Sequence, residues 1–419
     1  MKLKNYLLAL KTKDLRNKIL FIFFIFTIFR LLANIPTPGI DKEAMKNFFS
    51  RFQAFGLLNI FTGGALERIS IVMLGLGPYI IAIVILQLLT LIFPSLEKLY
   101  KEGGKEGREK FEQYGRILTL PLCIFQSFGM LQLFVREGVL PPFSLLGWIS
   151  SILTVSAGTL LLMWLGELIS EKGLGNGVSL LIFAGIAADF PSNLFQILTT
   201  FESTRIFSYL LFFAASFLII VGVCIVNQSR RKIPVTYSKR VRGTKLFGGV
   251  STYLPIPLNP AGVMPIIFAL SLLTFPSTVA QFFSGKIAQT ISGFFNNFIF
   301  HSIAYFILVF VFTFFYTWIV FEPKQLAENL QKFGGFVPGI RPGKQTQEYF
   351  SSVLNRILIF GAIFLGLIAI SPQLVQTLTN VKAFSFLVGG TSLLIIVSVV
   401  LETVARLKSE IEMREYDKI

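Results

Sequence analysis

Apolar segments of about 20 residues recur along this chain, and their length and number constrain the fold more than any other feature. A helix needs roughly 20 apolar residues to cross the hydrocarbon core of a membrane. Ten segments have this character, near residues 18–35, 72–93, 116–135, 147–169, 177–190, 206–226, 260–280, 302–321, 353–373 and 384–405. Hydrophobic residues make up 53% of the chain, which is typical of membrane proteins. The sequence therefore predicts an all-α polytopic membrane protein with ten transmembrane helices.

The distribution of positive charge predicts the orientation of these helices. Most of the 38 Lys and Arg residues lie in the two tails and the even-numbered connections, so this side is expected to be cytoplasmic. Ten spans place both termini there. The basic and then apolar N-terminus could be read as a secretory signal, but Arg30 and the turn at 36–39 follow instead of a cleavage site. We expect a retained first span.

Two long polar connections interrupt the apolar pattern on the basic side, at about 227–259 and 323–352. The first contains the run QSRRKIPVTYSKRVRGTK. One interpretation is that the run is merely an orientation signal that also contacts anionic lipid head groups. It can equally be a docking surface for RNA or an acidic protein. Both interpretations remain open from the residues alone.

The connection at 36–70, on the opposite side, does not turn straight back into the next span. It contains the stretch LLNIFTGGALERIS, which is weakly amphipathic and carries a Gly63-Gly64 pair. This stretch predicts either a helix lying in the membrane interface or a segment that folds inward and blocks a path.

An internal repeat divides the chain into two halves, 1–205 and 206–419. The fifth segment opens with GVSLLI (177–182) and the tenth with GTSLLI (390–395), while GLGPYI (75–80) in the second echoes GVMPII (262–267) in the seventh. Because each half has five spans, the second half must be inverted relative to the first. Inverted repeats of this kind place the functional site at the interface between the halves.

The residues at this interface are aliphatic, which favours a hydrophobic constriction over a site for a small polar solute. Ordinary helix packing explains any one of these residues better than a function does, and only the repeat favours a functional role for the set. The choice of individual side chains also draws on the family resemblance given below. The candidates are Leu76, Ile80, Val178, Ile182, Ile267 and Ile395.

Ionisable residues are placed poorly for catalysis or ion coupling. Among the Glu residues, Glu167 and Glu402 lie within the apolar segments, both near segment ends, and His301 is the only histidine. A zinc metalloprotease helix needs two histidines and an aspartyl dyad needs two membrane Asp residues. Cys123 and Cys224 lie in apolar segments and predict core residues, so we expect no metal and no cofactor. The Asp residues all lie in tails, loops or segment ends: Asp14, Asp41, Asp189 and Asp417.

Eight motifs along the chain resemble the SecY/Sec61 family of protein-conducting channels, in its bacterial form. They follow the order of the family through nearly the whole chain. The motifs are FRLLANIPTPGID (29–41), FTGGALERISIVMLGLGPYI (61–80), ILQLLT (85–90), KEGGKEGREKFEQYGR (101–116), MWLGELISEKGLGNGVSLLIFAGI (163–186), YLPIPLNPAGVMPIIFA (253–269), ENLQKFGGFVPGIRPGKQTQEY (328–349) and GGTSLLI (389–395).

The resemblance implies a clamshell of two five-helix halves around an hourglass pore, with the six aliphatic candidates as its ring. It implies a plug at about 57–70, and a lateral gate between the second and seventh spans where Gln87 and Ser271 are candidate polar residues. The candidate plug residues are Phe61, Gly63, Gly64 and Leu66.

The resemblance also assigns the polar connections to partner docking. In the stretch GGFVPGIRPGKQTQEYF (334–350), prolines fix φ and glycines permit tight turns around Arg341. A preordered loop then presents one guanidinium suited to carboxylate or phosphate. The family often has an arginine pair in the first connection, and here the basic candidates are Lys239, Arg240, Arg242 and Lys245.

These implications describe the pore-forming subunit of a Sec-type protein translocase that is not itself an enzyme. The implied partners are SecE and SecG-type small subunits, the SecA ATPase, the ribosome, secretory preproteins with their signal peptides, and membrane lipids. The expected location is the bacterial inner (plasma) membrane with both termini cytoplasmic, although a thylakoid membrane remains open. Two alternatives are a solute transporter, which would need polar residues at the midplane, and a membrane anchor that recruits RNA or ribosomes.

Overall fold

The predicted spans correspond to ten long helices in the part of the chain that the computed structural model describes. This part comprises residues 13–37, 41, 43–45, 48, 59, 62–101, 103–199, 206–237, 240–242, 245–247, 251–280, 298–379 and 390–416. The long helices are α2 (Lys13–Ala33), α5 (Gly77–Thr90), α7 (Gly104–Arg136), α8 (Leu145–Lys172), α9 (Gly177–Thr199), α10 (Ile206–Gln228), α11 (Met264–Ala280), α13 (Phe298–Val320), α15 (Lys344–Thr379) and α17 (Gly390–Tyr416). Two shorter helices, α6 (Pro94–Lys101) and α14 (Pro323–Lys332), lie in connections.

Length and hydropathy separate these helices into two groups. Among the described residues, five helical stretches are long and apolar enough to cross a membrane; they lie in α7, α8, α10, α13 with α14, and α15. Helices α5 and α6 add a sixth if the pair, bent by 110°, counts as one span. The apolar parts of α9 and α11 are shorter, at Gly177–Pro191 and Met264–Leu273. The short helices include those that the repeat predicts at the interface.

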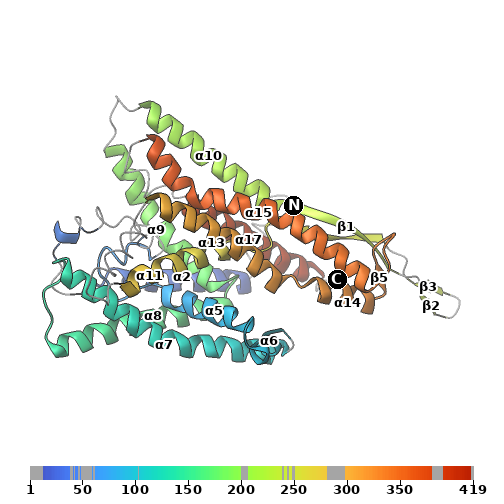
Figure 1. Ribbon diagram of the computed structural model, residues 1–419, viewed down its shortest axis with the longest axis horizontal. Coiled ribbons are helices and arrows are strands. Elements are labelled where there is room, and N and C mark those ends of the chain that lie inside the picture. Colours follow the sequence, from blue (N-terminus) through green and yellow to red (C-terminus); the bar gives the residue numbers. More distant parts are fainter. Residues whose placement is uncertain are drawn as a thin grey trace.

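The two halves of the chain lie against each other along matching helices. In Figure 1, α7 and α8 run along one side and α10 and α15 along the other, with α5, α9 and α11 between them. Helix α5 contacts α11, and α9 contacts α17. These are the second with the seventh span and the fifth with the tenth, the pairs that share sequence motifs. The helices that the sequence repeat matches are therefore neighbours in the fold, as an inverted repeat predicts.

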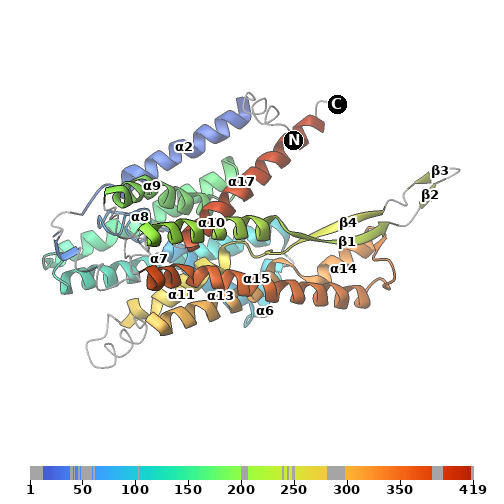
Figure 2. The same ribbon diagram turned by 90° about the horizontal axis from the view of Figure 1, so that it is seen from above.

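The described ends of the chain lie toward the same end of the molecule as the strands (Figures 1 and 2). Near these ends the Lys18 ammonium of α2 forms an ion pair with the Glu410 carboxylate of α17. Two chain ends on the same side of the molecule are consistent with an even number of spans.

A small β-structure, which the sequence analysis did not predict, is built from both polar connections. The strands are β1 (Arg230–Tyr237), β2 (Arg240–Arg242), β3 (Lys245–Phe247), β4 (Ser251–Pro257) and β5 (Gly335–Phe336). Strand β1 pairs antiparallel with β4 on one edge and with β5 on the other, while β2 pairs with β3. Figure 2 shows β1 and β4 extending beyond the helices, with β2 and β3 at the far tip.

A continuous apolar core fills the centre of the membrane part and joins residues of α2, α5, α8, α9, α11, α13, α15 and α17. Cys123 is buried and Cys224 is partly buried, and both are free, as expected of core residues. A separate small core lies under the strands, where Ile233, Ile256, Val337 and Phe350 pack together.

Candidate functional site

The matched motifs begin their helices with the same local geometry. Gly75 has φ +57° and Gly262 has φ +62°, conformations that side-chain-bearing residues rarely adopt. Helix α5 starts two residues after Gly75, and α11 starts two residues after Gly262. In each helix the second residue is proline, which is tolerated in the first turn because that N–H has no intrahelical acceptor. Two interrupted helices therefore begin at equivalent points in the two halves.

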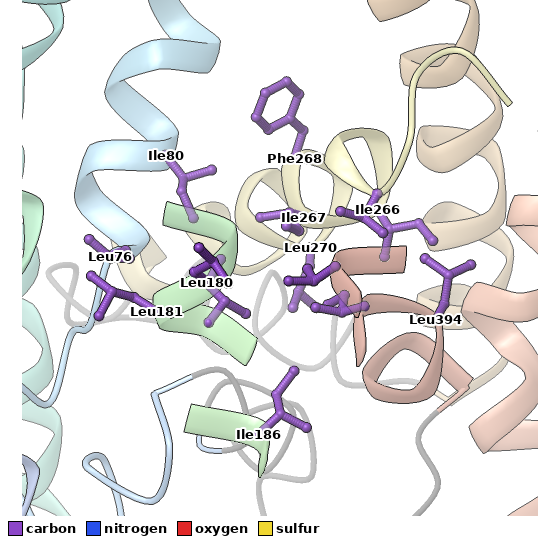
Figure 3. Close-up of a cluster of buried hydrophobic side chains, with 14 of the residues drawn as sticks. Leu76, Ile80, Leu180, Leu181, Ile186, Ile266, Ile267, Phe268, Leu270 and Leu394 are labelled. Carbon is purple, nitrogen blue, oxygen red and sulfur yellow. The ribbon is translucent and has the colours of Figure 1, made fainter. Parts of the chain in front are cut away.

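The six aliphatic candidates converge from four helices and are called the candidate ring below. Five of them are buried and belong to one contiguous cluster, and Val178 is partly buried and packs against it. Leu76 directly precedes α5 and Ile80 lies in its first turn. Figure 3 shows both beside Leu180 and Leu181 of α9, with Ile267 of α11 nearby. The remaining members, Ile182 and Ile395, come from α9 and α17.

All six candidate-ring side chains are aliphatic, and they come from helices of both halves. Close-packed aliphatic side chains exclude water and offer no hydrogen bond to an ion or small polar solute. They form no covalent or strongly directional contacts, so separation of the halves exposes side chains without breaking a polar network. This chemistry suits a closed constriction that opens by movement of helices.

The described part of the plug segment, residues 59 and 62–70, is buried except for Glu67 and Arg68 instead of lying on the surface. Leu66 is 1% exposed, and Gly63 and Gly64 have φ +65° and +76°. A Cβ added at Gly63 would lie 2.7 Å from the Cα of Gly185 in α9, so the two backbones are in direct contact. The end of the segment pairs with the chain after α2 through the bridge between Pro36 and Ser70. Phe61 lies outside the described residues.

The predicted gate helices, α5 and α11, contact each other directly. Gln87 of α5 is buried, and its Oε1 atom has no hydrogen-bond partner. Ser271 of α11 is partly buried. An unpaired buried amide oxygen costs about 1–3 kcal/mol, so Gln87 weakens the packing of α5.

Strands β1–β5 and the loop that carries Arg341 come from both polar connections and form one structural unit, called the docking unit below. Thr236 of β1 pairs with Phe336 of β5, which ties the first connection to the second. Arg341 is exposed and lies between Gly339 and Gly343, which have φ +82° and +100°. Its carbonyl accepts a 2.9 Å hydrogen bond from the Thr346 hydroxyl, which fixes the loop to the start of α15.

The other basic candidates lie at the tip of the docking unit. Arg240 and Arg242 are in β2 and Lys245 is in β3, where Arg242 pairs with Lys245. Lys239 lies outside the described residues. The ladder therefore places these three positions together, apart in sequence from Arg341 but on the same projecting unit (Figure 2).

Comparison with known proteins decides the family. Residues 70–404, which are most of the chain, match the family model described as SecY. The chain belongs to the SecY family. It is 42% identical over 430 residues to the protein translocase subunit SecY of Streptomyces scabiei, covering 98% of both chains. It is 41% identical over 433 residues to that of Thermus thermophilus, covering 99% of this chain and 97% of the relative.

Solved structures share the fold of this SecY family member. A structure of a protein-conducting channel matches with a TM-score of 0.66 at 17% identity, covering 96% of this chain and 93% of that one. Sec61 in a canine ribosome-channel complex matches with a TM-score of 0.64 at 18% identity and the same coverage. The all-α membrane fold expected from the sequence is thereby confirmed.

Sequence reasoning on this SecY family chain missed two polar clusters. The Arg30 guanidinium lies between the plug segment and Asp189 of α9. Asn227 of α10 donates a 2.6 Å hydrogen bond to Ser398 of α17 and accepts one of 3.2 Å from Asn259. Arg30 in an apolar segment was a visible signal, but its partner is 159 residues away and no local pattern names it. Among the described residues, no group of acidic, His and Cys side chains could hold a metal ion.

Proposed function

We propose that this chain is the pore-forming subunit of a Sec-type protein translocase. It conducts unfolded secretory polypeptides across the membrane between its halves, 1–205 and 206–419. The observation that carries the proposal is that five of the six aliphatic candidates, from both halves, belong to one buried cluster and that the sixth, Val178, packs against it. A polypeptide presents side chains of every kind, and an apolar constriction passes them without binding any one class. Relatives over 40% identical carry the name protein translocase subunit SecY.

The same architecture supports a side exit for apolar segments. We place the lateral gate between α5 and α11, where Gln87 and Ser271 lie. Signal sequences and transmembrane segments leave there into lipid, because their apolar side chains gain by moving from the pore to hydrocarbon. The plug segment closes the pore in the resting state, and its buried position against α9 supports this role.

Partner binding is assigned to the docking unit. Arg341 is exposed, and the sequence adds Lys239, Arg240, Arg242 and Lys245 to the same connections, a set of basic residues suited to the SecA ATPase or to ribosomal RNA. SecE and SecG-type subunits complete the complex in a bacterial inner membrane, with both termini cytoplasmic. The chain itself is not an enzyme, and its partners supply the energy for transport.

A site-specific photo-crosslink tests the proposal. A photoreactive residue replaces Ile182 of the candidate ring, and an arrested secretory precursor engages the complex in native membranes. The matched control carries the same group at Leu218 of α10, a side chain that is 69% exposed on the outside of the bundle. Precursors arrested at increasing lengths report which residue lies at each position.

The expected result is an adduct at position 182 that moves along the precursor as the precursor lengthens, with none from position 218. If position 182 gave no adduct while partner binding through Arg341 persisted, the chain would be a docking platform and the pore assignment would be wrong. Equal adducts at both positions would place the precursor in lipid.

A further inference from the structure

One arginine side chain connects three separate elements at the inner face of the plug segment. Arg30 of α2 donates from Nη1 to the Gly63 carbonyl at 2.8 Å and from Nη2 to Asp189 Oδ1 at 3.1 Å. Both charged side chains are largely shielded from solvent, with 32% and 18% of their surface exposed. A charge inside an apolar helix is costly unless it is paired, so these two acceptors satisfy Arg30 where it lies.

The plug backbone lies tightly against α9 at the same place. A Cβ at Gly63 would lie 2.7 Å from Gly185 Cα, and a Cβ at Gly64 would lie 3.0 Å from Asp189 Oδ2. Gly185 and Asp189 are four residues apart and therefore neighbours on the helix surface. Only glycines allow the plug to approach this closely, and both adopt positive φ.

The face of α9 that holds the plug also carries two members of the candidate ring. Val178, Ile182, Gly185 and Asp189 follow each other at spacings of four, three and four residues, which places them along one face of a helix. Because α9 is one continuous helix, a movement that withdraws Val178 and Ile182 from the ring also moves Asp189. The constriction and the plug anchor therefore share one rigid element.

We propose that Arg30 and Asp189 form a latch that holds the plug segment on α9 and couples opening of the ring to release of the plug. The proposal rests on the proposed function and assigns a positioning role to two residues outside the candidate ring. The segment that directly follows α2 also holds the far end of the plug: Thr37 N–H donates to the Ile69 carbonyl at 3.0 Å, and Arg68 bonds to Asn34. Movement of α9 relative to α2 therefore strains the hydrogen bonds that Arg30 makes to Gly63 and Asp189.

The test compares plug variants with matched controls in vesicles that contain the complete complex. Arg30→Gln removes the ion pair to Asp189, and Arg116→Gln removes the 2.7 Å tertiary ion pair to Glu167, which does not involve the plug. Gly63→Ala adds a clash at a positive φ, whereas Gly138→Ala adds the same strain at φ +73° with no atom within 4 Å.

Two readouts report the latch without using transport. The first is resting ion leak across the vesicle membrane. The second is modification of a thiol at Ala65, a plug position that is 0% exposed, with Cys123 and Cys224 replaced by alanine. We expect Arg30→Gln to raise both about tenfold, as expected for loss of one hydrogen bond to a charged group. Gly63→Ala should also raise both, because its added Cβ meets the backbone of α9, and both controls should leave them unchanged.

Unchanged leak and labelling in both plug variants would overturn the latch. If Arg30→Gln failed to accumulate, the test would rest on the comparison of Gly63→Ala with Gly138→Ala. Equal ion leak in these two variants would also overturn the latch. The photo-crosslink from position 182 separates the two proposals. A precursor adduct with no effect of the plug variants would remove the latch and leave the pore, whereas absence of the adduct in the unmodified protein would remove the pore.

Discussion

In the membrane part, helices that match between the two halves contact each other, α5 with α11 and α9 with α17. In the docking unit, all five strands come from residues 230–336 of the second half, and the described residues of the first half form no strand. The first region is symmetric and apolar, and the second is one-sided and basic. Symmetry suits a path between two halves, whereas a one-sided unit lets a partner bind at one membrane face. The two functions should therefore be separable by mutation.

The largest expected effect comes from reversing the charge at Arg341. Arg341→Glu should lower partner-driven transport by at least about 30-fold, because loss of a hydrogen-bonded interfacial charge pair costs about 2–5 kcal/mol. Resting ion leak should stay unchanged, since Arg341 is far from the ring. Transport assays in vesicles measure both quantities. Arg406→Glu, at an exposed arginine of α17, is the matched control. An equal loss of transport there would mean that overall positive charge, and not the Arg341 contact, determines transport.

A polar substitution in the ring should have the opposite signature. Ile182→Asn places an amide among aliphatic side chains, where an unpaired polar group costs about 1–3 kcal/mol and attracts water. Resting leak should rise about tenfold while partner binding stays at its normal affinity. Ile182→Val is the conservative control. Loss of partner binding together with increased leak would show that the two regions are not independent.

The spans and the repeat could be predicted from sequence because both are local patterns. Each apolar segment predicted from the sequence contains a helix or most of one, and the motifs at 177–182 and 390–395 identified the matching helix starts. Hydropathy marks only the apolar part of a helix, so it missed that α7 begins at Gly104 and α15 at Lys344. Both helices continue beyond the predicted spans as polar turns that pack against the connections.

The contacts that sequence could not predict join residues distant in the chain. Strand β5 completes a sheet begun about 100 residues earlier, and two residues of ladder give almost no local signal. Arg30 and Asp189 were each visible as unusual residues, but only the fold brings them together. Gln87 was identified by resemblance, whereas its lack of a hydrogen-bond partner follows only from packing.

A smaller effect should follow from loosening the docking unit without touching its charges. Val337→Ala removes two buried methyl groups from the small core under the strands, at a local cost of about 1–3 kcal/mol. Partner affinity should fall about three- to tenfold because the Arg341 loop loses preorganisation. Equilibrium binding of the partner to vesicles measures this. Val400→Ala, at an exposed position of α17, is the control, and no change in affinity would mean that the loop is ordered by binding itself.

The smallest expected effect comes from the gate. Gln87→Leu replaces a buried amide that lacks one partner with an apolar group of similar size, which should stabilise the contact between α5 and α11 by about 1 kcal/mol. Insertion of a weakly apolar signal sequence should slow about two- to fivefold, with ion leak unchanged or lower. Faster insertion would show that Gln87 acts in the closed state through a contact that stabilises it.

The central claim is that both halves of the chain surround one polypeptide path. Its most direct measurement is photo-crosslinking from four ring positions on four helices, at Ile80, Ile182, Ile267 and Ile395, to a precursor arrested at one fixed length. We predict that all four positions react with the same short stretch of the precursor. Adducts from only one half, or adducts at widely separated stretches, would contradict a shared path through the ring.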